Sequence, residues 1–354
     1  MSVTIALAGN PNCGKTTMFN ALTGANQYVG NWPGVTVEKK EGKLKNQKDV
    51  TVTDLPGIYS LSPYTLEEVV SRDYLLKEKP DVIIDLVDAT NIERNLYLAT
   101  QLLEIGIPVV IALNMVDLLK KNNIHINVKG LSSALGCPIV ETSALKGTGL
   151  KEVVDEAIKC ANQHRVPSKQ MEFPKAVEKA VNEIEGFVPA NIAEENKRWY
   201  AVKLLERDSK VKEGLNLPAS AQSRIEEIAS GLEKAEDDDT ESIVTDGRYQ
   251  YIQKVVSANV KRSGNKMTVS DKIDRIVTNR ILGLPIFILT MFIVYYVSVT
   301  TVGTMVTDWT NDSFVGTIQG VVSDGLGNAG VADWLVSLVS DGIIGGLGAV
   351  LGFV

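Results

Sequence analysis

The sequence predicts a doubly wound α/β domain with a mostly parallel sheet, followed by an all-α domain and a transmembrane helical segment. The chain has 354 residues, and at about 150 residues per domain this length is typical of two or three folding units. Strand-like and helix-like patterns alternate over residues 1–165, and apolar residues follow helical spacing over 166–262. No charged residue occurs from 281 to 307, and a basic linker, 263–280, precedes that span.

Composition excludes one broad class and separates the chain into two parts. The net charge of −7 argues against a nucleic-acid binder, because such a protein needs Lys and Arg to neutralise phosphates. No Lys or Arg follows Arg280. Three cysteines, Cys13, Cys137 and Cys160, have neither paired nor metal-ligand spacing, which favours a reducing cytoplasm. No signal peptide is expected, since no basic segment precedes an apolar run at the N-terminus.

The first 165 residues alternate short β-branched runs with helical patterns. Such runs are typical of parallel strands that are buried on both faces, and the alternation implies βαβ units with ligands at the carboxyl ends of the strands. Charged, alternating residues from Val37 to Thr53 predict an antiparallel edge hairpin. The predicted strands are Val3–Ala8, Asp81–Val87 and Pro108–Leu113, and the predicted helices are Thr16–Leu22, Ile92–Ile105 and Leu150–Ala161.

Residues 166–262 show helical spacing of apolar residues but no catalytic constellation. The acidic run Glu236–Asp239 is interpreted as a solvated loop or helix start rather than a cation site. The apolar positions are Ala176, Val177, Ala180, Val181 and Ile184, then Trp199, Val202, Leu204 and Leu205, then Ile225, Ile228 and Leu232.

The uncharged span from Ile281 to Thr307 has 27 residues, and about 20 such residues cross a bilayer as a helix. A buried core helix is the alternative, but core helices seldom run so far without a charge. Basic residues precede the span and none follows it, so the positive-inside rule places residues 1–280 in the cytoplasm and the protein in the cell (inner) membrane.

Residues 308–354 read as the Gly-rich start of a larger membrane domain. The uncharged run Gly342–Val354 has 13 residues, which is too short to cross a bilayer and suits a close helix contact or a re-entrant segment. Because the chain ends within this run, we expect the natural product to continue, or the chain to be a shortened form.

A P-loop pattern follows the first predicted strand and opens the first predicted helix. In Gly9-Asn-Pro-Asn-Cys-Gly14-Lys15-Thr16 the glycines let backbone N–H groups curl around phosphate. Lys15 supplies charge to the β and γ phosphates, and Thr16 offers its hydroxyl to Mg²⁺. The pattern predicts a nucleotide site without selecting the base.

A second motif selects guanine, and two more complete the site. Asp117, in Asn114-Met-Val-Asp117, can accept from guanine N1–H and the exocyclic amine, a donor pair that adenine lacks. Asp54 can hold Mg²⁺ through water, Gly57 can donate its N–H to the γ phosphate, and Ser143-Ala144-Leu145 is placed to touch the base. Four motifs in order at strand ends predict a P-loop GTPase domain that binds GTP and GDP.

The sequence resembles the Ras-like translation-factor class of GTPases and, more closely, the ferrous iron transport protein B (FeoB) family. The resemblance extends over the whole chain. It is carried by Gly9-Asn-Pro-Asn-Cys-Gly-Lys-Thr-Thr-Met-Phe-Asn20, Val29-Gly-Asn-Trp-Pro-Gly-Val-Thr36-Val-Glu38, Asp54-Leu-Pro-Gly-Ile-Tyr-Ser-Leu61, Trp199-Tyr-Ala-Val-Lys-Leu-Leu-Glu206 and Gly345-Gly-Leu-Gly-Ala-Val-Leu-Gly-Phe-Val354.

The resemblance implies a cytoplasmic GTPase domain, a helical domain that modulates nucleotide release, and a polytopic membrane domain that carries Fe²⁺. It also implies further spans and candidate iron-handling cysteines beyond residue 354. Expected partners are guanine nucleotide, the membrane, a small cytoplasmic partner protein and further copies of the chain, but no nucleic acid.

These motifs assign residues to each part of the site. The expected catalytic residues are Lys15, Thr36 and Gly57, and the expected Mg²⁺ ligands are Thr16, Thr36 and Asp54. The expected nucleotide-binding residues are Gly9, Asn10, Pro11, Asn12, Cys13, Gly14, Lys15, Thr16, Thr17, Gly34, Val35, Thr36, Asp54, Leu55, Pro56, Gly57, Asn114, Met115, Asp117, Ser143, Ala144 and Leu145.

One departure from the general GTPase pattern bears on the mechanism. Ile58 occupies the position at which Ras-like enzymes carry the glutamine that orients the attacking water. We therefore expect slow hydrolysis or activation by another group. K⁺ is predicted to supply it, bound by Asn12 and, as the resemblance implies, by backbone carbonyls of Gly30 and Trp32; alternatively, Asn12 only stabilises the P-loop turn.

Two other functions compete with iron uptake. A membrane-tethered regulatory GTPase, akin to tRNA-modification or ribosome-assembly enzymes, is disfavoured because the first 280 residues are almost neutral and lack a basic RNA-binding extension. An ATP-driven pump is disfavoured by Asn114 and Asp117.

Overall fold

A computed structural model describes residues 2–24, 27–45, 47–169, 171–262, 277 and 283–351. The chain divides into two compact units, Met1–Gly264 and Asn265–Val354, and each is described by itself. The predicted linker 263–280 lies outside the described residues except at Val277, as do the first two residues of the predicted span and the last three of the chain.

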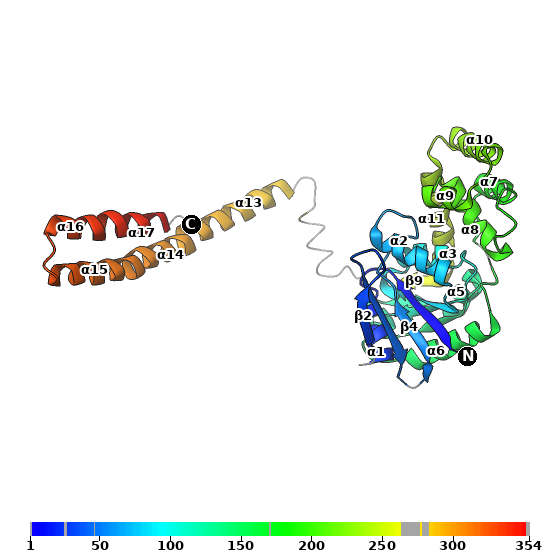
Figure 1. Ribbon diagram of the computed structural model, residues 1–354, viewed down its shortest axis with the longest axis horizontal. Helices are drawn as coiled ribbons and strands as arrows, with labels where there is room; N and C mark the ends of the chain where they lie inside the picture. The colour runs from blue at the N-terminus through cyan, green and yellow to red at the C-terminus, as the bar shows by residue number, and fades with distance from the viewer. Residues whose placement is uncertain are drawn as a thin grey trace. The chain divides into compact units, whose positions relative to one another are not determined.

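In the described part of the first unit, seven strands form one sheet in the order β2-β3-β4-β1-β5-β6-β8 (Figure 1). The pairs β1–β4, β1–β5, β5–β6 and β6–β8 are parallel, whereas β2–β3 and β3–β4 are antiparallel. The strands are β1 (Val3–Gly9), β2 (Gln27–Asn31), β3 (Glu38–Leu44), β4 (Gln47–Asp54), β5 (Val82–Asp88), β6 (Val109–Asn114) and β8 (Ile139–Glu141).

Helices cover both faces of this sheet and form two cores. On one face, α1 and α6 bury Phe19 and Val153 against β1 and β5. On the other face, α3 packs against the sheet, and the same core continues into the helical region. The helices are α1 (Lys15–Thr23), α2 (Leu66–Asp73), η1 (Tyr74–Glu78), η2 (Ala89–Asn91), α3 (Ile92–Leu102), α4 (Val116–Leu119), α5 (Val128–Leu135) and α6 (Leu150–Gln163).

The predicted mostly parallel α/β fold is confirmed, with differences at the edges. The hairpin predicted for 37–53 is antiparallel, but it is not at the edge, because β4 pairs with β1 and β2 forms the outer strand. Helix α3 ends at Leu102, three residues before the predicted end, where the chain turns toward Gly106 with φ +77°. Strands β2 and β8 were not predicted, because they are short and only partly buried.

The helical region, α7 to α11, packs on the same core as α3. Val181, Ile184, Trp199 and Val202 are fully or almost fully buried, as the apolar spacing predicted. The run Glu236–Asp239 ends one helix and starts the next, since the Asp239 side chain accepts from the Ser242 N–H at 2.9 Å. The helices are α7 (Lys175–Glu185), α8 (Glu194–Leu205), α9 (Ser209–Leu215), α10 (Ala219–Glu236) and α11 (Thr240–Asn259).

A two-stranded sheet returns the end of the helical region to the α/β region. Strand β9 (Val260–Arg262) follows α11 and pairs antiparallel with β7 (Ile124–Ile126). The Asn127 N–H also donates to the Asn259 carbonyl at 2.8 Å. The end of α11 and strand β9 therefore lie beside β7.

The second unit contains two helical stretches, Gly283–Asn328 with 46 residues and Asp333–Leu351 with 19, each long and apolar enough to cross a membrane. The first continues well past the predicted end at Thr307. The prediction that the last run is too short to cross is wrong, because its helix begins at Asp333 and includes Asp341. The elements are α13 (Gly283–Tyr295), η3 (Tyr296–Gly303), α14 (Thr304–Asp308), η4 (Trp309–Val315), α15 (Gly316–Asn328), α16 (Asp333–Ser337), η5 (Leu338–Gly345) and α17 (Gly346–Leu351).

The predicted close helix contact is present between these two stretches. A Cβ on Gly348 would lie 2.5 Å from Val315 Cγ1, so only glycine allows the observed approach. Gln319 Nε2 donates to the Ser340 carbonyl at 2.9 Å, which adds a polar link across the same contact.

Candidate nucleotide-binding site

The P-loop turns sharply between β1 and α1. Gly9 has φ +147° and Gly14 has φ +98°, backbone angles that residues with a side chain rarely adopt. A Cβ on Gly14 would lie 2.5 Å from Asn114 Nδ2, and one on Gly9 would lie 2.7 Å from the Leu86 carbonyl oxygen. These two glycines allow the backbone to curl at the N-terminus of α1, the conformation that a phosphate cradle requires.

Lys15 and Asp54 face each other beneath this loop. Lys15 Nζ lies 3.5 Å from Asp54 Oδ1, and both side chains are almost buried. Burial raises the pKa of Asp54, and the Lys15 ammonium opposes that rise. Beyond this ion pair with Lys15, Asp54 Oδ1 accepts no hydrogen bond from any described residue.

The segment after Asp54 lies against the P-loop. The Ile58 N–H donates to the Gly9 carbonyl at 3.4 Å, and a Cβ on Gly57 would lie 3.2 Å from Pro11 Cα. Ile58 is 2% exposed and belongs to the core. The Ile58 side chain therefore offers the P-loop no amide or basic group that could orient water, as the sequence predicted.

Asn114 joins the P-loop to the loop after β8. Its Nδ2 donates to the Cys13 carbonyl at 2.8 Å, and its Oδ1 accepts from the Ala144 N–H at 2.9 Å and from Thr142 Oγ1 at 3.3 Å. Asn114 is buried, and each of its side-chain polar atoms is hydrogen-bonded. It therefore holds these two loops in register.

Asp117 presents its carboxylate at the end of the same sheet. Ser143 Oγ donates to Oδ1 at 2.9 Å, and Lys146 Nζ lies 3.3 Å from Oδ2. The Ser143 hydrogen bond and the Lys146 charge lower the pKa of Asp117, which keeps the carboxylate ionised. Leu145, which lies between Ser143 and Lys146 in the sequence, has a side chain that is 84% exposed.

The loop from Gly30 to Thr36, which carries predicted K⁺ and Mg²⁺ ligands, makes no hydrogen bond to the Asn12 side chain within the described ranges. Thr36 and Gly34 are exposed, and Gly30 pairs with Lys39 in the sheet. Trp32 is buried, with its ring centroid 5.2 Å from that of Tyr74. Within the described ranges, no hydrogen bond links the Asn12 side chain to Gly30 or Trp32, so the K⁺ site stays a prediction.

No pattern in the sequence predicted the contacts between the segment after Gly57 and the helical region. Arg72 Nη1 donates to Asp208 Oδ2 at 2.8 Å, with both side chains 4% exposed. Lys203 Nζ donates to Ser62 Oγ at 3.2 Å. These partners are 136 and 141 positions apart, a separation that no local pattern reveals.

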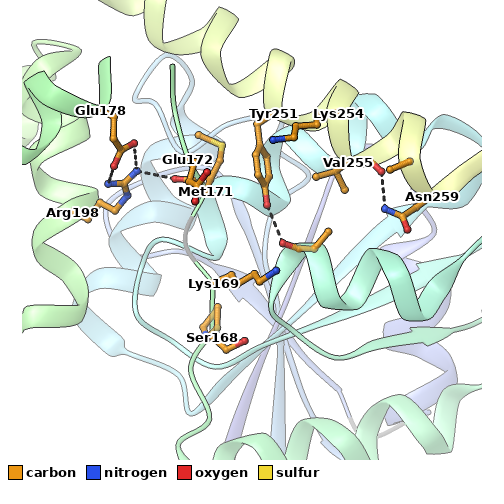
Figure 2. Close-up of a pocket in the computed structure, with 13 residues that line it drawn as sticks. Ser168, Lys169, Met171, Glu172, Glu178, Arg198, Tyr251, Lys254, Val255 and Asn259 are labelled. Atoms are coloured by element: carbon orange, nitrogen blue, oxygen red, sulfur yellow. Dashed lines mark hydrogen bonds and ion pairs between the residues drawn. The ribbon is translucent and has the colours of Figure 1, made fainter. Parts of the chain in front are cut away.

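A separate cavity of about 730 Å³ lies between α5 and α11 (Figure 2). Tyr251 donates to the Ala134 carbonyl at 3.0 Å, and Arg198 donates to both carboxylate oxygens of Glu178 and to the Met171 carbonyl. Nε of Arg198 has no hydrogen-bond partner among the described residues. The cavity is lined by none of the predicted nucleotide-binding residues.

Comparison with known proteins places the chain in a family. The model for ferrous iron transport protein B matches residues 3–157, and the model for the FeoB cytosolic helical domain matches residues 173–261. A GDP-bound FeoB G-domain from S. thermophilus is 47% identical, covers 73% of this chain and 100% of its own, and superposes with a TM-score of 0.71. The chain belongs to the FeoB family.

Two further FeoB proteins resemble this chain, one over its first two domains and one over almost its whole length. An NFeoB from S. thermophilus bound to GDP, AlF₄⁻ and K⁺ is 48% identical over 72% of this chain and 99% of its own, with a TM-score of 0.66. A Porphyromonas gingivalis fusion of Fe(2+) transport protein A with Fe(2+) transporter FeoB is 38% identical over 99% of this chain and 42% of its own length. The chain thus spans less than half the length of the curated FeoB relatives it matches.

Proposed function

We propose that this chain binds GTP at the loops after β1, β4, β6 and β8 and hydrolyses it to GDP and phosphate. One observation carries the assignment: Asp117 presents an ionised carboxylate in a loop that Asn114 ties directly to the P-loop. Guanine offers two donors to such a carboxylate, whereas adenine offers no matching pair. The fold and family of the G domain support the same conclusion.

The remaining residues take roles that follow from their chemistry. Lys15 and the backbone N–H groups from Gly9 to Thr17 hold the phosphates, and Gly57 donates its N–H to the γ phosphate. Thr16, Thr36 and Asp54 would hold Mg²⁺, which neutralises developing phosphate charge when bound. The buried Asp54 carboxylate supports this ligand set, because Oδ1 faces the Lys15 ammonium but accepts no hydrogen bond among the described residues.

K⁺ is the proposed activator of hydrolysis, bound by Asn12 and by carbonyls of Gly30 and Trp32. It would take the place of the glutamine that Ile58 replaces, because a positive charge between the phosphates offsets charge that develops in the transition state. The K⁺ found with the S. thermophilus relative supports the proposal.

The complete protein is proposed to take up Fe²⁺ across the cell membrane. This chain would supply its cytoplasmic GTPase and helical domains and its first membrane segments. The family and its named relatives support this role, as do two apolar stretches long enough to cross a bilayer. The proposed division is 1–165 for the G domain, 166–262 for the helical domain, 263–280 for the linker, 281–307 for the first span and 308–354 for the start of the remaining membrane domain.

The base assignment is tested by nucleotide competition. Wild-type protein should prefer GTP over ATP by at least about 100-fold, since a buried polar mismatch is strongly rejected. Asp117→Asn should lose GTP and gain xanthosine triphosphate, whose O2 accepts from an amide. Asp155→Asn, on the exposed face of α6, is the matched control and should behave as wild type. Equal ATP and GTP affinity would contradict the assignment.

The K⁺ proposal is tested by GTP turnover in KCl and NaCl at equal ionic strength. Wild type should be faster in K⁺, and Asn12→Ala should lose that difference while retaining GDP affinity. Stimulation that survives in Asn12→Ala would remove Asn12 from the site, and identical wild-type rates in both salts would reject K⁺ activation.

Iron uptake is tested in cells that carry the complete gene and lack other uptake routes. Lys15→Ala should abolish uptake of labelled Fe²⁺. Uptake that continues without GTP binding would instead favour a membrane-tethered regulatory GTPase.

A further inference from the structure

Lys146 is a cation at the base-recognition end that the proposed function does not use. Its ammonium lies 3.3 Å from Asp117 Oδ2, on the carboxylate that would receive guanine. The Lys146 side chain is 60% exposed, whereas that of Asp117 is 16% exposed. The lysine therefore reaches inward from solvent to a largely shielded group.

The loop that carries Lys146 fixes this approach. Ser143 and Thr148 pair across the loop, with the Ser143 N–H donating to the Thr148 carbonyl at 3.0 Å and the Thr148 N–H returning at 3.2 Å. The Lys146 N–H donates to the Ser143 carbonyl at 3.1 Å. Gly149 closes the turn with φ +73°, and a Cβ there would lie 2.1 Å from the Glu141 carbonyl oxygen. Lys146 is thus presented at the tip of a tight turn beside Asp117.

Lys146 and the guanine edge would both approach the Asp117 carboxylate. Ser143 already donates to Oδ1, and the guanine edge would place one donor on each carboxylate oxygen. We propose that Lys146 is a specificity-determining residue whose ammonium competes with the guanine edge for Asp117. The proposal rests on the GTP site described above and adds a competitor that weakens guanine nucleotide binding.

The size of the effect follows from exposure. Because Lys146 is mostly in solvent, its ion pair belongs to the weak class of exposed salt bridges. Displacing it should change nucleotide affinity about two- to fivefold. The effect should shrink in high salt, which screens exposed charges.

Hypoxanthine separates competition from general charge effects. It retains the N1–H donor but lacks the exocyclic amine of guanine, so one carboxylate oxygen stays available to Lys146. Loss of the lysine should therefore tighten GDP binding and leave IDP binding nearly unchanged. A lysine that merely attracted phosphate would affect both nucleotides equally, and in the opposite direction.

The test measures GDP and IDP dissociation constants by titration calorimetry on the detergent-solubilised full chain. Lys146→Ala should bind GDP about two- to fivefold tighter, with no comparable gain for IDP, and Lys146→Arg should resemble wild type. Lys151→Ala, an exposed lysine in the first turn of α6, controls for the loss of one nearby charge. Raising KCl to 1 M should reduce the difference between wild type and Lys146→Ala.

The outcomes separate this proposal from the one it rests on. Equal or weaker GDP binding by Lys146→Ala, or an equal gain for IDP, would overturn the competition while a wild-type preference for GDP over ADP still supports the GTP site. A wild-type protein without that preference would overturn both.

Discussion

The nucleotide end of the sheet and the junction with the helical region both hold cations against carboxylates, but the contacts differ in kind. At the nucleotide end, Lys15 lies 3.5 Å from Asp54 and Lys146 lies 3.3 Å from Asp117. Each distance is longer than that of a good charge-assisted hydrogen bond. One oxygen of Asp54 also lacks a donor among the described residues. These contacts leave capacity for a ligand.

At the junction, the corresponding contacts are short and shielded. Arg248 donates to both oxygens of Glu104, at 3.1 and 2.7 Å, with side chains that are 0% and 1% exposed. Within the helical region, Arg198 likewise donates to both oxygens of Glu178, whose side chain is 29% exposed. The paired oxygens there already accept guanidinium donors, so the junction carries no comparable capacity for a ligand. The difference lies in the carboxylate oxygens, which are fully engaged by guanidinium donors in these pairs and have spare capacity at the nucleotide end, although Nε of Arg248 and of Arg198 has no hydrogen-bond partner among the described residues.

The largest expected effect comes from breaking the Arg248–Glu104 pair. Arg248→Ala leaves the Glu104 carboxylate buried and unpaired, so the free energy of unfolding should fall by about 3–5 kcal/mol. Urea denaturation of the detergent-solubilised chain, followed by the fluorescence of buried Trp199, measures this loss.

A double variant provides the control for that prediction. Arg248→Met combined with Glu104→Leu removes both charges and should recover most of the stability, because neither partner is then left unpaired. A loss below about 1 kcal/mol for Arg248→Ala would show that the junction is no more dependent on its ion pairs than an exposed surface.

An intermediate effect is expected at Asp85, a buried acid in β5 that sharpens the comparison because it forms no salt bridge with any described residue. It is 1% exposed, and its Oδ2 has no hydrogen bond within the described part of the chain. Burial raises the pKa of Asp85 from 3.8 to about 7. Between these values the folded state keeps a proton that the unfolded state has lost, so this group makes the protein less stable as pH rises from about 4 to 7.

Asp85→Asn should remove that loss. The difference in the free energy of unfolding between Asp85→Asn and wild type should be roughly 2–3 kcal/mol more favourable to the variant at pH 8 than at pH 5. The measurement is the same urea titration at the two pH values. Asp155→Asn, on the surface of α6, should show no such difference. A pH-independent effect of Asp85→Asn would mean that the carboxylate is ionised, and therefore paired, in the folded protein.

Local patterns predicted the parts of the fold and site that depend on neighbouring residues. The P-loop prediction followed from Gly9 and Gly14, whose positive φ values and close contacts, with the Leu86 backbone and the Asn114 side chain respectively, exclude a side chain. Asn114 and Asp117 followed from their place after an apolar strand. The sequence did not reveal that Asn114 binds the Cys13 carbonyl, because that contact spans 101 positions.

The missed features depend on tertiary packing. The edge strand β2 was missed because its sequence has no apolar alternation. Its pairing with β3 is what makes it a strand. The pairing of β7 with β9 joins segments more than 130 positions apart along the chain. Lys146 belongs to a surface loop in which any lysine looks solvent-exposed, so its contact with Asp117 could not be predicted.

The smallest expected effect is at Tyr59, beside the nucleotide end. The guanidinium carbon of Arg94 lies 4.4 Å from the centroid of the Tyr59 ring, which is 41% exposed. Arg94 also touches the P-loop, since its carbonyl accepts from Asn10 Nδ2 at 3.5 Å. This pair could stabilise the segment after Gly57, but an exposed cation–π contact contributes only about 0.5–1 kcal/mol.

Tyr59→Leu removes the aromatic face and should reduce the free energy of unfolding by less than about 1 kcal/mol, with GTP turnover reduced no more than about fivefold. Tyr59→Phe keeps the ring and should match wild type, which separates the cation–π contact from any role of the hydroxyl. A double-mutant cycle with Arg94→Met isolates the pair, and its coupling energy should stay within the same range. A loss of turnover above 100-fold for Tyr59→Leu would place a strong, complete contact at the nucleotide end, and the contrast with the junction would then fail.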